Sequence, residues 1–169
     1  MFYGFKNEKG LSLIELVISI SIISILTVAG VISLSKTKTY QNVDIATGEL
    51  KVTIIKAKNY AQNPPEKYQG LDYKQYGVKI DKTNNKYWLV AKKSDGGNTD
   101  LIEYNLPDKV IFGNINLKKN TAVLSEIIFD IESRAKITNL GEDGTIEIKN
   151  NVDTKTIIIK YPYGSVEAR

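Results

Sequence analysis

The sequence contains no cysteine and no histidine. Without cysteine the chain can form no disulfide and offers no thiolate to a metal. Without histidine it lacks the commonest general base and metal ligand of enzymes. A catalytic site would then need paired carboxylates or a Ser–Lys couple, and neither pattern stands out. The composition therefore predicts that the protein is not an enzyme and that it uses no metal and no cofactor.

The excess of positive over negative charge is also small. The 169 residues carry 23 Lys and Arg against 19 Asp and Glu, a formal net charge of +4. Proteins that bind nucleic acid usually gather their basic residues on one face, and the sequence shows no such cluster. We therefore do not expect nucleic acid among the partners. The length is that of one helix and one globular domain of ordinary size.

One long apolar run stands near the start of the chain. From Leu11 to Leu34 the only ionisable side chain is that of Glu15. About 20 apolar residues are enough for a helix to cross a bilayer. A carboxylate inside such a helix costs roughly 2.5–3.5 kcal/mol on insertion scales, so it usually has a partner and a function. If the chain is cut after Gly10, the new amine of Leu11 is a positive charge four residues before Glu15.

This arrangement resembles the class III signal of type IV pilins and type II secretion pseudopilins. The residues that carry the resemblance are Gly10, Leu11, Leu13, Ile14 and Glu15. In that family a short basic leader ends in Gly, the first mature residue is hydrophobic, and the fifth is Glu. The resemblance implies that a prepilin peptidase cuts between Gly10 and Leu11 and methylates the Leu11 amine. It also implies that Glu15 pairs with the N-terminal amine of a neighbouring subunit.

An ordinary membrane anchor or an ordinary secretory signal would also contain an apolar run. An anchor accounts for the hydrophobicity but not for a carboxylate one turn inside it. A secretory signal has an apolar stretch of about 7–15 residues before a small-x-small cleavage site, and Ser33-Leu34-Ser35 would serve as one. We favour the pilin-type interpretation because the run is longer than that and contains Glu15. Lysines flank the run on both sides, so a cytoplasmic leader rests on the resemblance alone.

The helical pattern continues beyond the apolar run. One stripe at three- and four-residue spacing contains Val43, Ala46, Thr47, Leu50, Ile54, Ala57 and Ala61. Such spacing is one face of an amphipathic helix. Asn63-Pro64-Pro65 predicts its end, because proline lacks the amide donor and forces its predecessor out of helical geometry. The expected organisation is a leader at 1–10, a membrane-spanning assembly helix at 11–35, and a soluble head at 36–169 whose helix runs to about Gln62.

After Pro65 the apolar period changes to two, which is typical of strands. The expected strands are 77–81, 86–91, 101–106, 110–112, 115–117, 127–130, 145–149, 156–161 and 165–167. Their spacing is that of antiparallel hairpins. The sequence therefore predicts an α+β fold, with a long N-terminal helix packed on antiparallel sheet and the apolar strand 156–161 in its interior.

The second half of the chain resembles the H-type pseudopilins and the T-type fimbrial minor pilins. The resemblance runs from Leu106 to Val166 and includes the Leu106-Pro107 turn, the strand ending in Phe129, and the alternating hairpin that starts at Gly144. Asp130-Ile131-Glu132 departs from the group, which often has Pro or Gly there. The resemblance implies a minor subunit, and the sequence leaves open whether it belongs to a pilus or to a secretion pseudopilus.

The resemblance also implies a location and a set of partners. The chain is expected in the cell membrane as a single-pass protein before assembly, and in an extracytoplasmic filament afterwards. The expected partners are other pilin subunits, the prepilin peptidase, the inner-membrane assembly machinery and membrane lipid. A DNA-binding minor pilin and a solitary membrane-anchored β-domain remain as alternatives.

Two loops contain the oxygen ligands and glycines of a calcium loop, at residues 94–100 and 141–144. Neither has the spacing of the twelve-residue loop that ends in a bidentate Glu. Asp, Gly and Asn are equally typical of solvated turns. We therefore interpret both segments as turns without a bound ion.

Tyrosines and lysines are interleaved after the predicted helix, at Lys67, Tyr68, Tyr73, Lys74, Tyr76 and Lys79. Such a mixture could stack on the bases of single-stranded DNA. Some T-type minor pilins take part in DNA uptake through basic residues near the C-terminus. Here residues 161–169 contain one Arg and an opposing Glu, which disfavours that role. We favour the interpretation that the tyrosines pack across the connection from helix to sheet, with their hydroxyls in contact with water.

Overall fold

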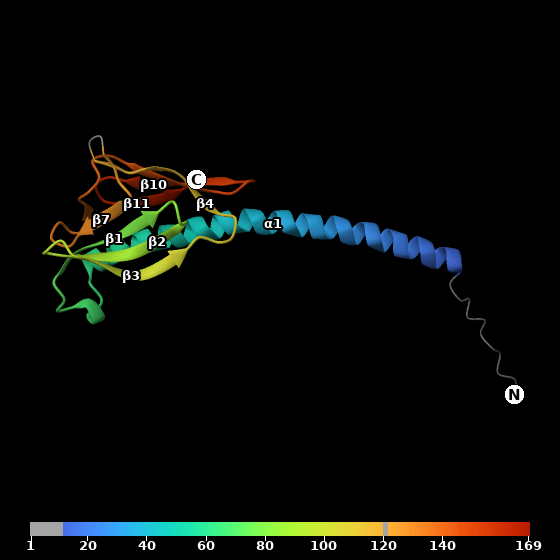
Figure 1. Ribbon diagram of the computed structural model, residues 1–169, viewed down its shortest axis with the longest axis horizontal. Helices are drawn as coiled ribbons and strands as arrows, with labels where there is room; N and C mark the ends of the chain where they lie inside the picture. The colour runs from blue at the N-terminus through green and yellow to red at the C-terminus, as the bar shows by residue number, and fades with distance from the viewer. Residues whose placement is uncertain (1–11, 120–121) are drawn as a thin grey trace, which may run out of the picture. The chain divides into compact units, whose positions relative to one another are not determined.

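The computed structural model describes residues 12–119 and 122–169 (Figure 1). A long helix, α1 (Leu13–Gln62), is followed by a short 3₁₀ helix, η1 (Glu66–Tyr68). The strands are β1 (Tyr73–Asp81), β2 (Lys86–Lys93), β3 (Asn98–Asn105), β4 (Ile111–Asn116), β5 (Lys118–Lys119), β6 (Ala122–Val123), β7 (Glu126–Asp130), β8 (Lys136–Ile137), β9 (Gly144–Lys149), β10 (Thr154–Lys160) and β11 (Ser165–Ala168). The chain divides between Lys38 and Thr39 into two units. We describe the N-terminal segment (residues 13–38) and the head (residues 39–169) separately.

The end of α1 falls where the sequence predicted it. The backbone N–H of Asn63 donates to the carbonyl oxygen of Asn59 at 2.8 Å, and the two prolines follow directly. Neither proline has an N–H with which to continue the ladder of helical hydrogen bonds. The predicted start at Leu11 lies outside the described residues.

Two main antiparallel sheets make up the head. The five-stranded sheet has the order β3–β2–β1–β7–β8, and the four-stranded sheet has the order β11–β10–β9–β4. Strands β5 and β6 form a separate two-stranded hairpin. The chain therefore leaves the first sheet after β3, enters the second at β4, and returns to the first at β7, which pairs with β1. The predicted antiparallel character is confirmed, and the division between two sheets adds to it.

Several strands differ in detail from their predicted ranges. Segments 110–112 and 115–117 join into one strand, β4, whose register shifts between Phe112 and Ile115. Gly113 lies at this irregularity, where an added Cβ would come within 2.8 Å of Glu147. Strands β5, β6 and β8 have two residues each, too few for an alternating pattern to reveal. The apolar strand β10 lies between β11 and β9, so its predicted interior position is confirmed.

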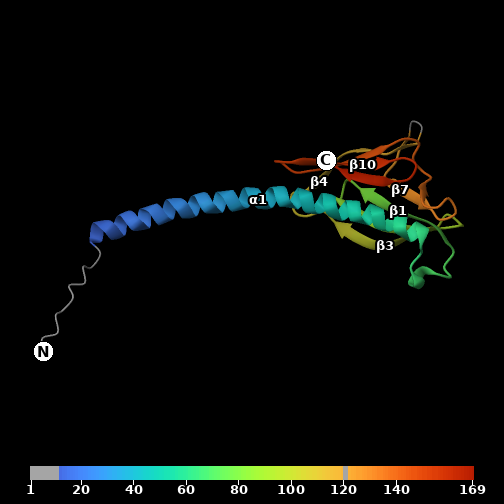
Figure 2. The ribbon, with the colours of Figure 1, turned by 180° about the vertical axis from the view of Figure 1, so that it is seen from behind.

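One hydrophobic core joins α1 to both sheets. The predicted stripe on α1 is buried throughout, comprising Val43, Ala46, Thr47, Leu50, Ile54, Ala57 and Ala61. The same core contains Tyr76 and Val78 of β1 together with Ile146 of β9 and Ile157 of β10. In Figure 1 strands β1, β2 and β3 lie in front of α1, and in Figure 2 α1 lies in front of the strands. The helix is thus one layer of the head, packed on its sheets.

Polar contacts also tie the β9–β10 hairpin to the first turns of α1 in the head. The side-chain amide of Asn150 donates to the carbonyl oxygen of Thr39 at 2.7 Å. Lys155 on β10 forms an ion pair with Asp44 on α1 at 3.3 Å. These contacts join segments more than 100 residues apart in the sequence.

Candidate functional site

Most of the N-terminal segment is one exposed apolar stretch of helix. Residues Leu13–Val31 form a 19-residue stretch of mean hydropathy 2.3, and none of it is buried within the protein. By length and composition this stretch of helix suffices to cross a membrane. A helix that is hydrophobic on all sides is stable only when other apolar matter surrounds it.

Hydroxyl groups in this stretch are satisfied within the helix itself. The side chains of Ser19, Ser21, Ser24 and Thr27 each donate to the carbonyl oxygen four residues earlier, at 2.8 Å. In lipid no water is present to take these hydrogen bonds, and an unsatisfied polar group there costs several kcal/mol. The hydroxyls are therefore compatible with an apolar environment. The carboxylate of Glu15 is not satisfied in the same way.

Glu15 lies in the first turn of α1. A negative charge at this position is favourable, because the first backbone N–H groups of a helix carry partial positive charge. Among the described residues its carboxylate has no ion-pair partner (residues 12–119 and 122–169). The predicted cleavage and methylation residues, Gly10 and Leu11, lie outside that part of the chain. Their roles, and the pairing of Glu15, stay predictions.

The predicted packing of the tyrosines is confirmed, but the expectation that their hydroxyls contact water is wrong for Tyr76, whose hydroxyl is buried in the core. Tyr60, Tyr68, Tyr73 and Tyr76 form one aromatic cluster at the end of α1 and the start of β1, with Tyr60 and Tyr76 edge-to-face at 5.7 Å between ring centroids. Tyr76 is fully buried and Tyr68 is 8% exposed. Burial raises the pKa of the Tyr76 hydroxyl. The rings of Tyr68 and Tyr76 are therefore not accessible for stacking on bases, whereas Tyr60 and Tyr73 are partly buried.

The interleaved lysines each contact a different side chain. The ammonium of Lys67 lies 4.7 Å from the centroid of the Tyr68 ring, and that of Lys79 lies 5.4 Å from Trp88. Lys74 forms an ion pair with Glu132 at 3.3 Å. Each of these lysines thus has its own neighbour within the head.

The two glycine-rich loops use their carboxylates to hold turns. Asp95 accepts a hydrogen bond from the backbone N–H of Gly97 at 2.8 Å. Asp143 accepts two, from the ammonium of Lys160 and from the backbone N–H of Tyr161, both at 2.9 Å. In the part of the chain that the structure describes, no three His, Cys, Asp or Glu residues gather as a metal site would require.

Asp143→Asn is expected to destabilise the head at neutral pH but not at acid pH. The hydrogen bond from Lys160, then that from Tyr161, holds the pKa of Asp143 below its usual value. A carboxylate whose pKa is lower in the folded state stabilises that state above its unfolded pKa, and this contribution disappears as the pH falls below about 4.

Thermal unfolding of Asp143→Asn and of the unchanged chain, at neutral pH and near pH 3, checks this expectation. Asp95→Asn, in the other glycine-rich loop, is the matched control. Added calcium should leave the melting temperature of the unchanged chain where it is. A calcium-dependent rise that Asp143→Asn abolishes would contradict the interpretation of this loop as a plain turn.

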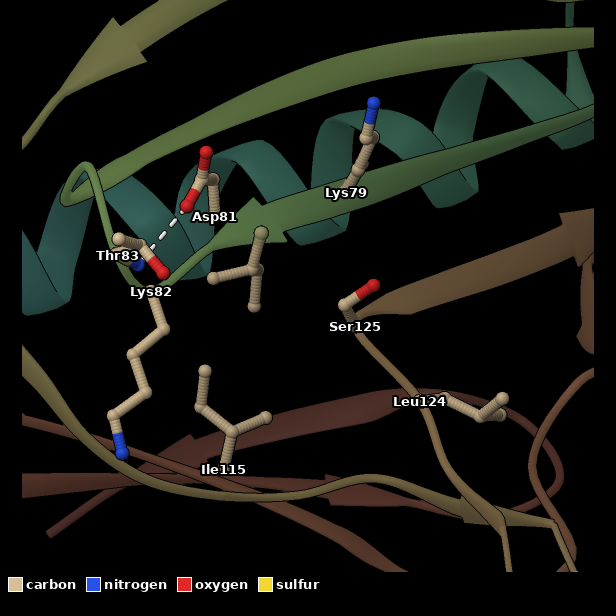
Figure 3. Close-up of a pocket in the computed structure, with 8 residues that line it drawn as sticks. Lys79, Asp81, Lys82, Thr83, Ile115, Leu124 and Ser125 are labelled. Carbon is tan, nitrogen blue, oxygen red and sulfur yellow. Dashed lines mark hydrogen bonds between the residues drawn. The ribbon is translucent and has the colours of Figure 1, made fainter.

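A cleft of about 530 Å³ lies in the head between the turn after β1 and the residues that lead into β7 (Figure 3). Asp81 stands at its edge, and its carboxylate is occupied by the backbone N–H groups of Thr83 and Asn84. The side-chain amide of Asn84 also donates a hydrogen bond to Asp81. This side-chain bond is the largest cause of the lowered pKa of Asp81, and the backbone bonds lower the pKa further. The ammonium of Lys82 points away from Asp81.

Comparison with known proteins supplies two findings. Residues 5–31 match the model of the prokaryotic N-terminal methylation motif. Among solved structures, the fold is similar to that of the minor pseudopilin EpsH from the Type 2 Secretion System of Vibrio cholerae, with a TM-score of 0.54 and 11% sequence identity. The match covers 76% of this chain and 96% of that one. No curated protein matches the chain in sequence. The chain thus combines the methylation motif with a pilin-like α+β fold.

Proposed function

We propose that this chain is a minor pilin or pseudopilin, a structural subunit of a type IV pilus or of a type II secretion pseudopilus. One observation carries the proposal: the apolar stretch Leu13–Val31 is unburied along its whole length and holds a single carboxylate in its first turn. So large an apolar surface needs lipid or other helices around it. The methylation motif over residues 5–31 and the pilin-like head support the same function.

The N-terminal segment serves two states of the subunit. Before assembly it spans the cell membrane once, and the leader (residues 1–10) is removed there. During assembly residues 11–35 leave lipid and pack laterally against the helices of other subunits, while the head at 36–169 remains outside the membrane. The prepilin peptidase and the inner-membrane assembly machinery act on the subunit in the first of these states.

Glu15 selects the arrangement of the packed helices. Its partner is the methylated amine of Leu11 on a neighbouring subunit, and this pairing fixes the axial position of one helix against the next. A buried ion pair adds little stability over apolar packing, but a buried charge without a partner costs about 3–5 kcal/mol. Misplaced subunits are therefore rejected. Head-to-tail contacts that do not close into a ring then generate a helical filament.

Cleavage between Gly10 and Leu11 tests this proposal. In cells that contain a prepilin peptidase, intact-mass measurement and N-terminal sequencing should find a mature chain that begins at methylated Leu11. Gly10→Val should block the cut by placing a branched side chain at the cleaved bond, whereas Gly4→Val, a matched change within the leader, should not. A mature chain that begins at Lys36 would instead indicate an ordinary secretory signal, and an uncut chain would indicate a solitary membrane anchor.

A further inference from the structure

The helix α1 carries a second apolar stripe in the head, which the sheets leave exposed. Ile45, Val52 and Ile55 are 52%, 63% and 37% exposed. Together with Gly48 they follow the alternating three- and four-residue spacing of a heptad repeat, with Ile45 and Val52 at position a and Gly48 and Ile55 at position d. Figure 2 views the head from this side, with α1 in front of the strands.

A hole is already formed in this stripe. Four residues of the stripe and its flank, Ile45, Gly48, Glu49 and Val52, line a groove of about 370 Å³. Thr53, Lys56 and Tyr104 of β3 also line it, and Tyr104 forms one wall. The spacing of the first four, i, i+3, i+4 and i+7, is that of the four residues that receive one side chain of a facing helix. The floor is open because Gly48 has no side chain, and a Cβ built there would meet nothing within 4 Å. The Tyr104 ring stacks on Tyr87 at 5.0 Å, which holds this wall of the groove in place.

We propose that this hole receives Ile55 of a second copy of the chain, whose α1 lies parallel and is displaced by one heptad. The inference rests on the proposed function in one respect: two copies anchored in the same membrane by their N-terminal segments must pair with parallel helices. Seven residues correspond to about 10.5 Å along the helix axis.

Pairing without displacement is disfavoured by both shape and charge. The side chain opposite the hole would be Gly48 of the second copy, which has nothing to insert. Positions g and e of parallel helices face each other five residues apart, so Asp44 would meet Glu49 and Lys51 would meet Lys56. Each of these like-charge contacts would occur twice in a symmetric pair, and each is destabilising.

Displacement by one heptad fills the hole and replaces most of the like-charge contacts with opposite-charge contacts. Ile55 of the second copy then faces Gly48 and fills the hole. Glu49 of the first copy meets Lys51 of the second, and Asp44 meets Lys56. Asp44 also pairs with Lys155 at 3.3 Å in its own head, yet it remains 62% exposed and accessible to a second lysine.

The displaced pair has two further properties. One repulsive contact remains, between Lys56 of the first copy and Lys58 of the second, against two attractive ones. The pair is also asymmetric, because the hole of the second copy faces Gln41 of the first. Adjacent copies of this subunit would therefore lie at successive heights, as in a filament, and the subunit would occur in more than one copy.

Cross-linking distinguishes the two arrangements directly. The chain has no cysteine of its own, so introduced cysteines are the only reactive thiols. Two differently tagged full-length copies are expressed together in membranes, one with Glu49→Cys and the other with Lys51→Cys. The displaced pair brings these two positions together, and we call their disulfide the displaced product.

The matched control combines Asp44→Cys in one copy with Glu49→Cys in the other. These two positions meet only in the pair without displacement, and we call their disulfide the undisplaced product. We expect the displaced product to exceed the undisplaced product by about tenfold, since several like-charge contacts are exchanged for opposite-charge ones.

Substitutions of Gly48 test whether the hole itself matters. Gly48→Leu fills the hole from its own helix and should abolish the displaced product. The head should still fold, because a Cβ added at Gly48 meets nothing within 4 Å and the groove is open to solvent. Gly48→Ala, a smaller change at the same residue, should reduce the displaced product only partly.

Three results would overturn the inference: a predominant undisplaced product, a displaced product that Gly48→Leu leaves unchanged, or cross-links from Glu49→Cys only to a different protein. N-terminal sequencing of the protein from the same membranes distinguishes failure of this inference from failure of the proposed function. A chain cut at Gly10 that yields no displaced product retains the pilin function and loses the displaced pair. An uncut chain refutes the pilin function, whatever product forms.

Discussion

Glu15→Leu is expected to leave the protein in the membrane and to deplete it from assembled filaments. The substitution removes a carboxylate that costs roughly 2.5–3.5 kcal/mol in lipid, so the membrane-inserted state becomes more stable. It also removes the partner of the Leu11 amine of a neighbour, which leaves that positive charge unmatched in an apolar bundle. Cleavage at Gly10 should persist, because the apolar run remains unbroken.

The ratio of processed protein in membranes to protein in sheared filaments or cross-linked complexes measures this effect. Ser19→Leu is the matched control. It makes the same helix more apolar one turn further on, but it removes a hydroxyl that is already bonded to the Glu15 carbonyl oxygen. Its ratio should stay near that of the unchanged chain. If Glu15→Leu behaves in the same way, Glu15 does not guide assembly and the subunit joins through contacts of its head.

Leu50→Ala is expected to reduce the free energy of unfolding of the head by about 2–5 kcal/mol. Leu50 is fully buried where α1 packs on the sheets. Its truncation removes apolar contacts and leaves a cavity that the surrounding strands fill only in part. Since a whole domain is stable by only about 5–15 kcal/mol, this loss is a large fraction of the total.

Val52→Ala is the control for this substitution, because Val52 lies two residues further along the same helix and is 63% exposed. Its effect should stay within about 0.5 kcal/mol. Urea unfolding of the full chain in detergent can be followed by the fluorescence of Trp88, the only tryptophan, whose indole N–H donates to Glu103 at 3.1 Å. Equal losses for the two variants would show that α1 does not form part of the core.

Those features that depend on short stretches of chain were predicted well. The end of α1 follows from the covalent chemistry of Pro64 and Pro65, whatever surrounds them. The buried stripe of α1 follows from the helical period, and β9 and β10 follow from alternation or apolar content. The apolar N-terminal stretch with its carboxylate is likewise a property of consecutive residues. These patterns are local, so no knowledge of distant contacts is needed to recognise them.

The pairing of strands that lie far apart in the sequence was not predicted. The pairing of β7 with β1 joins residues about 50 positions apart, and no turn between them fixes it. This pairing places β7 in the five-stranded sheet, while β4 and β9 belong to the four-stranded one. The sequence also holds both apolar stripes of α1, one through Leu50 and one through Val52, with similar periods. Which stripe the sheets cover is decided by the complete set of packed side chains in the core.

The open hole at Gly48 likewise depends partly on local sequence and partly on distant contacts. The sequence by itself determines that a helix passes there, that a glycine lies in its apolar stripe, and that charges flank it. Only the tertiary structure decides that this stripe faces outward and that Tyr104, from a strand more than 50 residues away, walls the groove. A helical period fixes which residues share a face, but the direction in which that face points is a property of the folded whole.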